Sequence, residues 1–209
     1  MQILNLFPTP VWIRQLEPER AEGINRQAID LIDRLREETP GINPGDRWQT
    51  PNNLETRPEL QDLMSIVKEG AQEALSALRI EHNGFLVTGC WANIKPAGSG
   101  HRPHSHPNNY LSGVYYVRMP SHGGRILFHD PRIQPYIILP RLTERNEYNC
   151  RIAHLPIREG VLILFPAWIT HSVEDNPEDL DRISISFNIM FKQFGEEIAR
   201  PRWEYVPGS

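Results

Sequence analysis

The spacing of apolar residues changes at Phe85, and this change constrains the fold more than any other feature of the chain. Before Phe85, apolar residues recur every three or four positions in Glu17–Glu38 and Thr56–Leu78, which predicts two amphipathic helices. After it, apolar residues fall in short runs separated by Pro and Gly, which is typical of strands. The sequence therefore predicts two helices followed by a β-rich body.

Eight short strands after two helices indicate a mainly β protein with a double-stranded β-helix (jelly roll) and N-terminal helices packed on one sheet. We expect one domain over residues 1–209, with a helical flank and edge strand over 1–80 and the jelly-roll core over 85–192. The expected strands are Phe85–Lys95, Tyr110–Arg118, Arg125–His129, Tyr136–Leu139, Arg151–Leu155, Val161–Phe165, Ile169–Val173 and Arg182–Lys192.

Three further segments of the N-terminal part carry local signals. Met1–Leu16 alternates apolar residues around two prolines, which predicts an edge strand. Residues 41–53 are rich in polar and turn residues, so we expect a loop. Thr56 and Glu59 have the spacing of a capping box, which predicts that the second helix starts there.

Composition excludes several classes of protein. The net charge is −4, so the chain shows no nucleic-acid-binding signature, and no apolar run approaches the roughly 20 residues needed to cross a bilayer. Cys90 and Cys150 are the only cysteines, too few for a disulfide framework. With no signal segment at the N-terminus, we expect a cytoplasmic protein, and a homodimer stays open.

The histidines indicate a metal site. His104 and His106 are two residues apart on an extended segment, so they point the same way and can face one cation. The third ligand must come from a distant strand, and His171 is well placed. It directly follows Phe165–Thr170, whose aromatic and apolar residues would form a dry wall. Imidazoles suit iron, copper, nickel and zinc. We interpret the scattered histidines as structural; they are His82, His122, His129 and His154.

An anion site is predicted on the last strand. Arg182 and Ser184 share one strand face, so a guanidinium and a hydroxyl can hold one carboxylate. The alternate positions, Ile183, Ile185 and Phe187, form a predicted core face. An arginine that faces the same pocket as the metal would bind an anionic cosubstrate.

These residues carry a family resemblance. The stretches W-A-N-I-K, H-S-H-P-N-N-Y-L-S-G-V-Y-Y-V, G-G-R-I-L-F-H-D-P-R, G-V-L-I-L-F-P-A-W-I-T-H-S-V and R-I-S-I-S-F-N resemble the non-haem Fe(II)/2-oxoglutarate-dependent dioxygenases. The similarity is greatest to a small bacterial and phage group, with prolyl 4-hydroxylase-like and aspartyl β-hydroxylase-like relatives. It covers roughly Cys90–Phe191.

The resemblance implies Fe(II), 2-oxoglutarate and molecular oxygen, and a hydroxylase acting on a small-molecule or peptide substrate. By this resemblance His171 is the distal iron ligand, and Arg182 with Ser184 binds 2-oxoglutarate. Polar contacts to cosubstrate or substrate are expected from Asn93, from Tyr115 or Tyr116, and from Asn188.

The proximal ligands depart from the H-x-D/E pattern of that superfamily. No Asp or Glu stands two residues after His101, His104 or His106. His106 itself occupies the carboxylate position that follows His104. Asn108 and Asp130 are alternative ligands, and aspartyl β-hydroxylase-like relatives also lack this carboxylate. Two other interpretations stay open. One is a cupin-like three-histidine metalloenzyme that does not use 2-oxoglutarate, and the other is a non-catalytic jelly-roll binding module.

Overall fold

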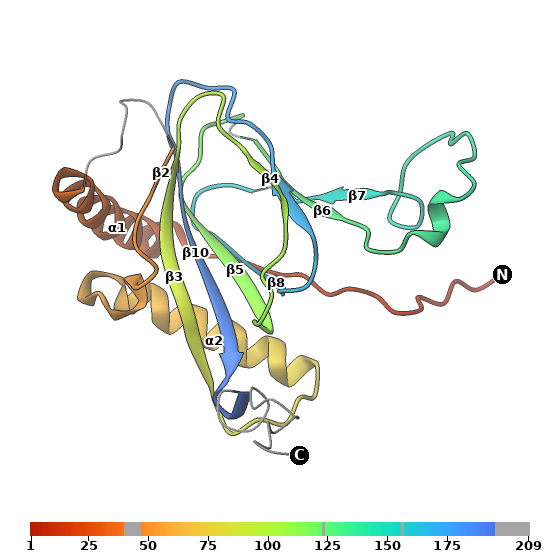
Figure 1. Cartoon of the computed structure of the whole chain (residues 1–209), viewed down its shortest axis with the longest axis horizontal. Helices are drawn as coiled ribbons and strands as arrows, with labels where there is room; N and C mark the ends of the chain where they lie inside the picture. The colour runs from red at the N-terminus through yellow and green to blue at the C-terminus, as the bar shows by residue number, and fades with distance from the viewer. Residues whose placement is uncertain (40–46, 123, 156, 195–209) are drawn as a thin grey trace, which may run out of the picture.

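Two antiparallel sheets form the body of the protein in a computed structural model, which describes residues 1–39, 47–122, 124–155 and 157–194 (Figure 1). The larger sheet has the strand order β1 (Trp12–Gln15), β8 (Val161–Pro166), β5 (Leu111–Arg118), β10 (Arg182–Phe191), β3 (Phe85–Lys95) and β2 (Trp48–Gln49). The smaller has the order β4 (His101–His104), β9 (His171–Val173), β6 (Ile126–His129) and β7 (Ile152–His154). The predicted jelly roll is confirmed.

Helices α1 (Pro18–Glu38) and α2 (Gln61–Ala77) cover the outer face of the six-stranded sheet (Figure 1). Their apolar stripes pack in one core with Ile183, Ile185 and Phe187 of β10. A second core lies between the two sheets and contains Val114, Phe128, Ile163, Phe165 and Ile169. The central strands of the six-stranded sheet are therefore covered on both faces, and the buried polar side chains of their inner face lie inside the jelly roll.

The second helix begins later than the capping-box pattern predicts. Two 3-10 turns, Leu54–Thr56 and Pro58–Leu60, precede the α2 start at Gln61. Arg57 is extended, at φ −76° and ψ 128°, because the ring of Pro58 disfavours the helical conformation in the preceding residue. The Thr56 hydroxyl donates to the Asn53 carbonyl oxygen instead of capping a helix.

The strand predicted at Tyr136–Leu139 is absent, and a 3-10 turn at Gln134–Tyr136 stands there instead. Ile137, Ile138 and Leu139 are exposed, so this apolar run reflects an excursion between β6 and β7 and not a core strand (Figure 1). The β4 strand was not predicted, and it brings the number of strands from Phe85 onward in the described residues to the expected eight.

The predicted N-terminal edge strand and the predicted loop at 41–53 are each found in part. The edge strand is confirmed as β1, but it pairs only from Trp12 onward, after Pro8 and Pro10. Of the loop predicted at 41–53, residues 41–46 lie outside the described residues and β2 occupies Trp48–Gln49. The single domain over 1–209 stays a prediction, since residues 195–209 are also outside them. In the described ranges neither helix is long and apolar enough to cross a membrane.

A buried hydrogen bond ties α1 to the sheet, and we expect its loss to destabilise the protein. The Tyr115 hydroxyl donates to Asn25 Oδ1 at 2.8 Å, and both residues are buried. Tyr115→Phe leaves the Asn25 oxygen unsatisfied, which should lower the free energy of unfolding by about 1–3 kcal/mol. Denaturant titration measures this loss. Tyr148→Phe, at a 55% exposed tyrosine, is the matched control and should change nothing; equal stabilities of the two variants would show that the bond contributes nothing.

Candidate active site

Strands β4 and β9 bring three histidines together. His104 lies directly opposite His171 in the antiparallel pair, and His106 follows two residues after His104. The ligand nitrogens of all three lie within 4.8 Å of one another. Nitrogens bound to one metal are roughly 3 Å apart when each bond is about 2.1 Å long, so a metal needs only a small inward movement. Among the described residues, no Asp, Glu or Cys joins this group.

Backbone carbonyls orient two of these rings. Nδ1 of His104 lies 2.8 Å from the Arg102 carbonyl oxygen, and Nδ1 of His171 lies 3.1 Å from that of Ile169. A carbonyl oxygen only accepts, so Nδ1 must carry the proton in each ring. The lone pair then remains on Nε2, which is how a neighbouring hydrogen bond selects the metal-binding nitrogen.

Burial keeps His106 and His171 neutral. The pKa of His171 is lowered to about 3, mainly by burial and further by the surrounding imidazoles, while the bond to the Ile169 carbonyl opposes the shift. Burial and then His104 lower the pKa of His106 to about 4. Neutral imidazoles have free lone pairs at neutral pH, so no proton has to leave before a metal binds.

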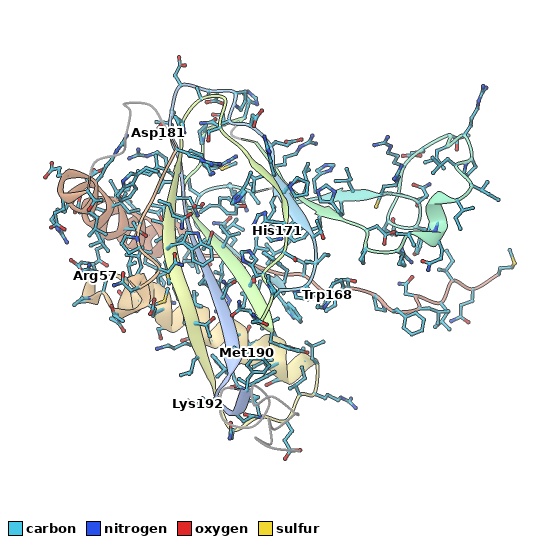
Figure 2. All side chains as sticks on the ribbon, viewed as in Figure 1. Arg57, Trp168, His171, Asp181, Met190 and Lys192 are labelled. Carbon is cyan, nitrogen blue, oxygen red and sulfur yellow. The ribbon has the colours of Figure 1, made fainter. Side chains whose placement is uncertain are left out.

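Aromatic rings shield one side of His171. Phe165 packs edge-on against it with ring centroids 4.7 Å apart, and Phe128 lies 6.2 Å away. Phe165 belongs to the stretch that the sequence predicted as a dry wall, whereas Phe128, on β6, was not part of that prediction. Trp168 departs from that prediction, because it is 56% exposed on the turn before His171 (Figure 2).

Of the two alternative ligands, Asp130 has another partner, and a metal-ligand role of Asn108 stays a prediction. Asp130 forms an ion pair with Arg132 at 2.9 Å and is outside the three-histidine group. Asn108 is an exposed turn residue with a φ of 64°, a conformation that Asn tolerates better than most residues. His101 stacks on His104 with centroids 4.1 Å apart but is not in the group either.

The predicted anion-binding residues lie on the inner face of the six-stranded sheet. Arg182 is only 2% exposed, and its Nη1 donates to the Glu174 carbonyl oxygen at 3.2 Å. Burial lowers the pKa of this guanidinium. A Cβ at Gly124 would lie 2.7 Å from Nη1, and Gly124 has a φ of 76°, so only glycine fits there. Ser184 is buried on the same strand face.

Strand register adds two of the other predicted residues to this face. Ser184 lies opposite Asn93 on β3 and Tyr116 on β5. Asn93 donates to the Ser186 hydroxyl, whereas Tyr116 is buried and close enough to Arg182 for the two to interact electrostatically. Tyr115 faces the helices, so Tyr116 is the tyrosine of the inner face.

Asn188 lies apart from this group. It is six residues from Arg182, on the order of 20 Å along an extended strand, and it accepts a hydrogen bond from Ser112 at 2.7 Å. Asn188 and Arg182 therefore cannot hold the same carboxylate, and a contact between Asn188 and substrate stays a prediction.

Sequence reasoning missed Lys95, which lies directly opposite Arg182 on β3 and is 7% exposed. Its ammonium donates to the Gly100 carbonyl oxygen at 3.1 Å. The alternation of β3 placed Lys95 on the same face as Asn93, but only the long-range pairing of β3 with β10 brings it beside Arg182.

The histidines and the cationic residues lie a short distance apart along the small sheet. Glu174, which Arg182 contacts, is three residues after His171, and Gly100, which Lys95 contacts, is four residues before His104. These separations amount to roughly 10–13 Å along extended chain. The arrangement can hold a metal at one end and the far carboxylate of a short dianion at the other.

Comparison with known proteins agrees with this arrangement. Residues 89–188 match the family described as "Putative 2OG-Fe(II) oxygenase". This match includes all the candidate site residues, so the chain resembles this family over the part that carries the candidate site. A comparison with curated proteins gave no match.

Solved structures show the same fold at low sequence identity. The epimerase SnoN from nogalamycin biosynthesis is 13% identical, with a TM-score of 0.63, and the match covers 88% of this chain and 77% of SnoN. A Pseudomonas putida prolyl-4-hydroxylase is 13% identical, with a TM-score of 0.58 and coverages of 88% and 94%. HygX from Streptomyces hygroscopicus, solved with nickel and 2-oxoglutarate, is 13% identical, with a TM-score of 0.60 and coverages of 88% and 83%.

We predict one transition metal per chain, bound by His104, His106 and His171. His171→Ala removes the only ligand from β9 and should abolish stoichiometric binding, as measured by metal analysis after dialysis and by calorimetric titration. His129→Ala is the matched control, because His129 bonds the Ser172 hydroxyl and lies outside the group. Near-stoichiometric metal in the His171→Ala protein would show that these histidines are not the site.

Proposed function

We propose that this protein is an Fe(II)- and 2-oxoglutarate-dependent dioxygenase that hydroxylates its substrate. The strongest support is that three clustered histidines and a buried Arg182 with Ser184 occur in one jelly roll. A cupin-like metalloenzyme explains the three histidines equally well, but it has no need of a buried arginine beside them.

The donor set fits iron. Imidazole nitrogen is a ligand that Fe(II) accepts, and the two carbonyl-bonded rings keep Nε2 as the nitrogen with a free lone pair. In this proposal His104, His106 and His171 hold the metal and leave positions for cosubstrate and oxygen. With iron, 2-oxoglutarate and O2 bound, the site would supply oxidative decarboxylation of 2-oxoglutarate to succinate and carbon dioxide, with one oxygen atom of O2 entering succinate and the other the substrate C–H bond.

The protein's own residues position the reactants. Arg182 offers a planar pair of N–H donors and Ser184 a hydroxyl, which together suit the distal carboxylate of 2-oxoglutarate. Tyr116 and Asn93 flank that carboxylate from the neighbouring strands. Phe165 and Phe128 exclude water from the His171 side, which strengthens every charge interaction at the site.

In this proposal, exposed side chains around the metal site select the substrate. Trp168 is the largest exposed apolar side chain close to His171 in sequence. Among the structural neighbours, one prolyl hydroxylase is in complex with a peptide fragment, and HygX has been solved with hygromycin B. We include both peptides and small molecules in the proposal. Hydroxylation is a narrower claim than dioxygenase activity, since the structurally similar SnoN is an epimerase.

The first test concerns the cosubstrate. Iron-loaded protein should convert 2-oxoglutarate to succinate, even if slowly, when no substrate is present. Arg182→Ala should weaken 2-oxoglutarate binding by about 2–5 kcal/mol, because it removes a buried, charged hydrogen-bonding partner. Calorimetry with the nickel-loaded protein measures this, and Arg79→Ala, at an exposed turn, is the control. Unchanged affinity in Arg182→Ala would reject the assignment and favour the cupin-like alternative.

The second test concerns the missing carboxylate. Three imidazoles leave the full 2+ charge on the metal, so they should hold Fe(II) weakly and attract the dianionic cosubstrate strongly. We therefore expect 2-oxoglutarate to tighten Fe(II) binding, by reciprocal linkage. His106→Asp adds a negative ligand and should bind Fe(II) tightly without 2-oxoglutarate.

Anaerobic Fe(II) titrations of both proteins, with and without 2-oxoglutarate, measure the four affinities. If His106→Asp abolishes binding, or if 2-oxoglutarate leaves the Fe(II) affinity of the unaltered protein unchanged, His106 is not a metal ligand.

A further inference from the structure

Two cationic side chains stand side by side inside the jelly roll. Lys95 and Arg182 are directly opposite on β3 and β10, where Cβ atoms are about 4.5–5.5 Å apart. They are 7% and 2% exposed. Like charges placed directly opposite destabilise a sheet, and burial increases the cost.

The two cationic groups reach the same end of the small sheet. Lys95 Nζ donates to the Gly100 carbonyl oxygen just before β4, and Arg182 Nη1 donates to the Glu174 carbonyl oxygen just after β9. These segments are in close contact, since a Cβ at Gly100 would lie 2.7 Å from the Val173 carbonyl oxygen. The Asn176 side chain donates to the Lys95 carbonyl oxygen and fixes the end of β3.

No carboxylate neutralises the ammonium within the part of the chain that the structure describes. Lys95 forms no ion pair there, and the charged groups that act on it are Arg47 and Arg182. Burial lowers the pKa of His101, on β4, and the charge of Lys95 in turn contributes to this lowering. Burial first, and then the two arginines, lower the pKa of Lys95 to about 8. An ammonium ion has three N–H donors, so donors remain for an anion after the bond to Gly100.

We propose that Lys95 is a second cationic ligand for the distal carboxylate of 2-oxoglutarate, acting beside Arg182. This inference rests on the proposed function. The carboxylate lies between the two strands and accepts from the guanidinium, the Ser184 hydroxyl and the ammonium. One anion then contacts both cations, of which Arg182 also interacts with the Asp175 carboxylate, while the charged groups that act on Lys95 among the described residues are themselves cations.

Binding to nickel-loaded protein tests this without turnover. The variants are Lys95→Met, which keeps length and loses charge, and Lys95→Arg, which keeps the charge. Lys68→Met, at an exposed lysine of α2, is the control. Each protein is titrated calorimetrically with 2-oxoglutarate and with 2-oxobutyrate, a 2-oxo acid that lacks the distal carboxylate.

Lys95→Met should weaken 2-oxoglutarate binding by roughly 30-fold or more, because it removes a buried charged partner. Lys95→Arg should recover most of this affinity, and Lys68→Met should match the unaltered protein. The affinity for 2-oxobutyrate should be the same in all four proteins. Unchanged 2-oxoglutarate affinity in Lys95→Met, or an equal loss for both acids, would overturn the proposal, since an equal loss indicates only structural damage.

The pH profile provides an independent test. Below about pH 8 the ammonium is protonated before binding, so affinity should be constant. Above that, binding must take up a proton, and affinity should fall by up to about tenfold per pH unit. Lys95→Arg stays charged and should show no fall between about pH 7 and about pH 9. Equal slopes in both proteins would contradict the role of Lys95.

Failure of the proposed function gives a different result. If the unaltered protein binds nickel but shows no preference for 2-oxoglutarate over 2-oxobutyrate, both proposals fail together. If Arg182→Ala loses that preference and Lys95→Met retains it, the proposed function stands and only the role of Lys95 is rejected.

Discussion

The two-residue alternation of β10 is the constraint on which the rest of this structure depends. Ile183, Ile185 and Phe187 face the helices and form the main core, while Arg182 and Ser184 face the interior of the jelly roll. A shift of one residue in register would exchange these faces and place a guanidinium against the helices. The apolar contacts that stabilise the sheet therefore also fix the position of the candidate anion-binding residues.

The candidate site exists only where the two sheets face each other. The small sheet contributes His171 from β9 and His104 from β4, and the large sheet contributes Arg182 from β10. A metal and a dianion bound together would connect both sheets, so they would also stabilise the fold, since ligands that bind only the native state raise its stability. The bonds from Lys95 and Arg182 to carbonyls of the small sheet already connect the sheets at that end.

Local periodicity predicted most of the fold and the faces of the site. The spacing of His104 and His106, and of Arg182 and Ser184, correctly placed each pair on one side of its segment. Where local signals failed, a competing local effect decided, as when Pro58 delayed the start of α2. Lys95 was out of reach for another reason. Its partner across the sheet is 87 residues away in the chain, and no local pattern reports that pairing.

The charges of the site explain why the metal and the cosubstrate should depend on each other. Three neutral imidazoles add no negative charge to the metal, and Lys95 and Arg182 add two positive charges at the other end. In a site with a carboxylate ligand, part of the metal's charge is compensated before 2-oxoglutarate arrives. In the proposed site the dianion itself would supply the compensation at both ends, one carboxylate toward the metal and one toward Lys95 and Arg182. The missing Asp or Glu and the additional buried lysine therefore have the same consequence: each makes the occupied site more favourable relative to the empty one.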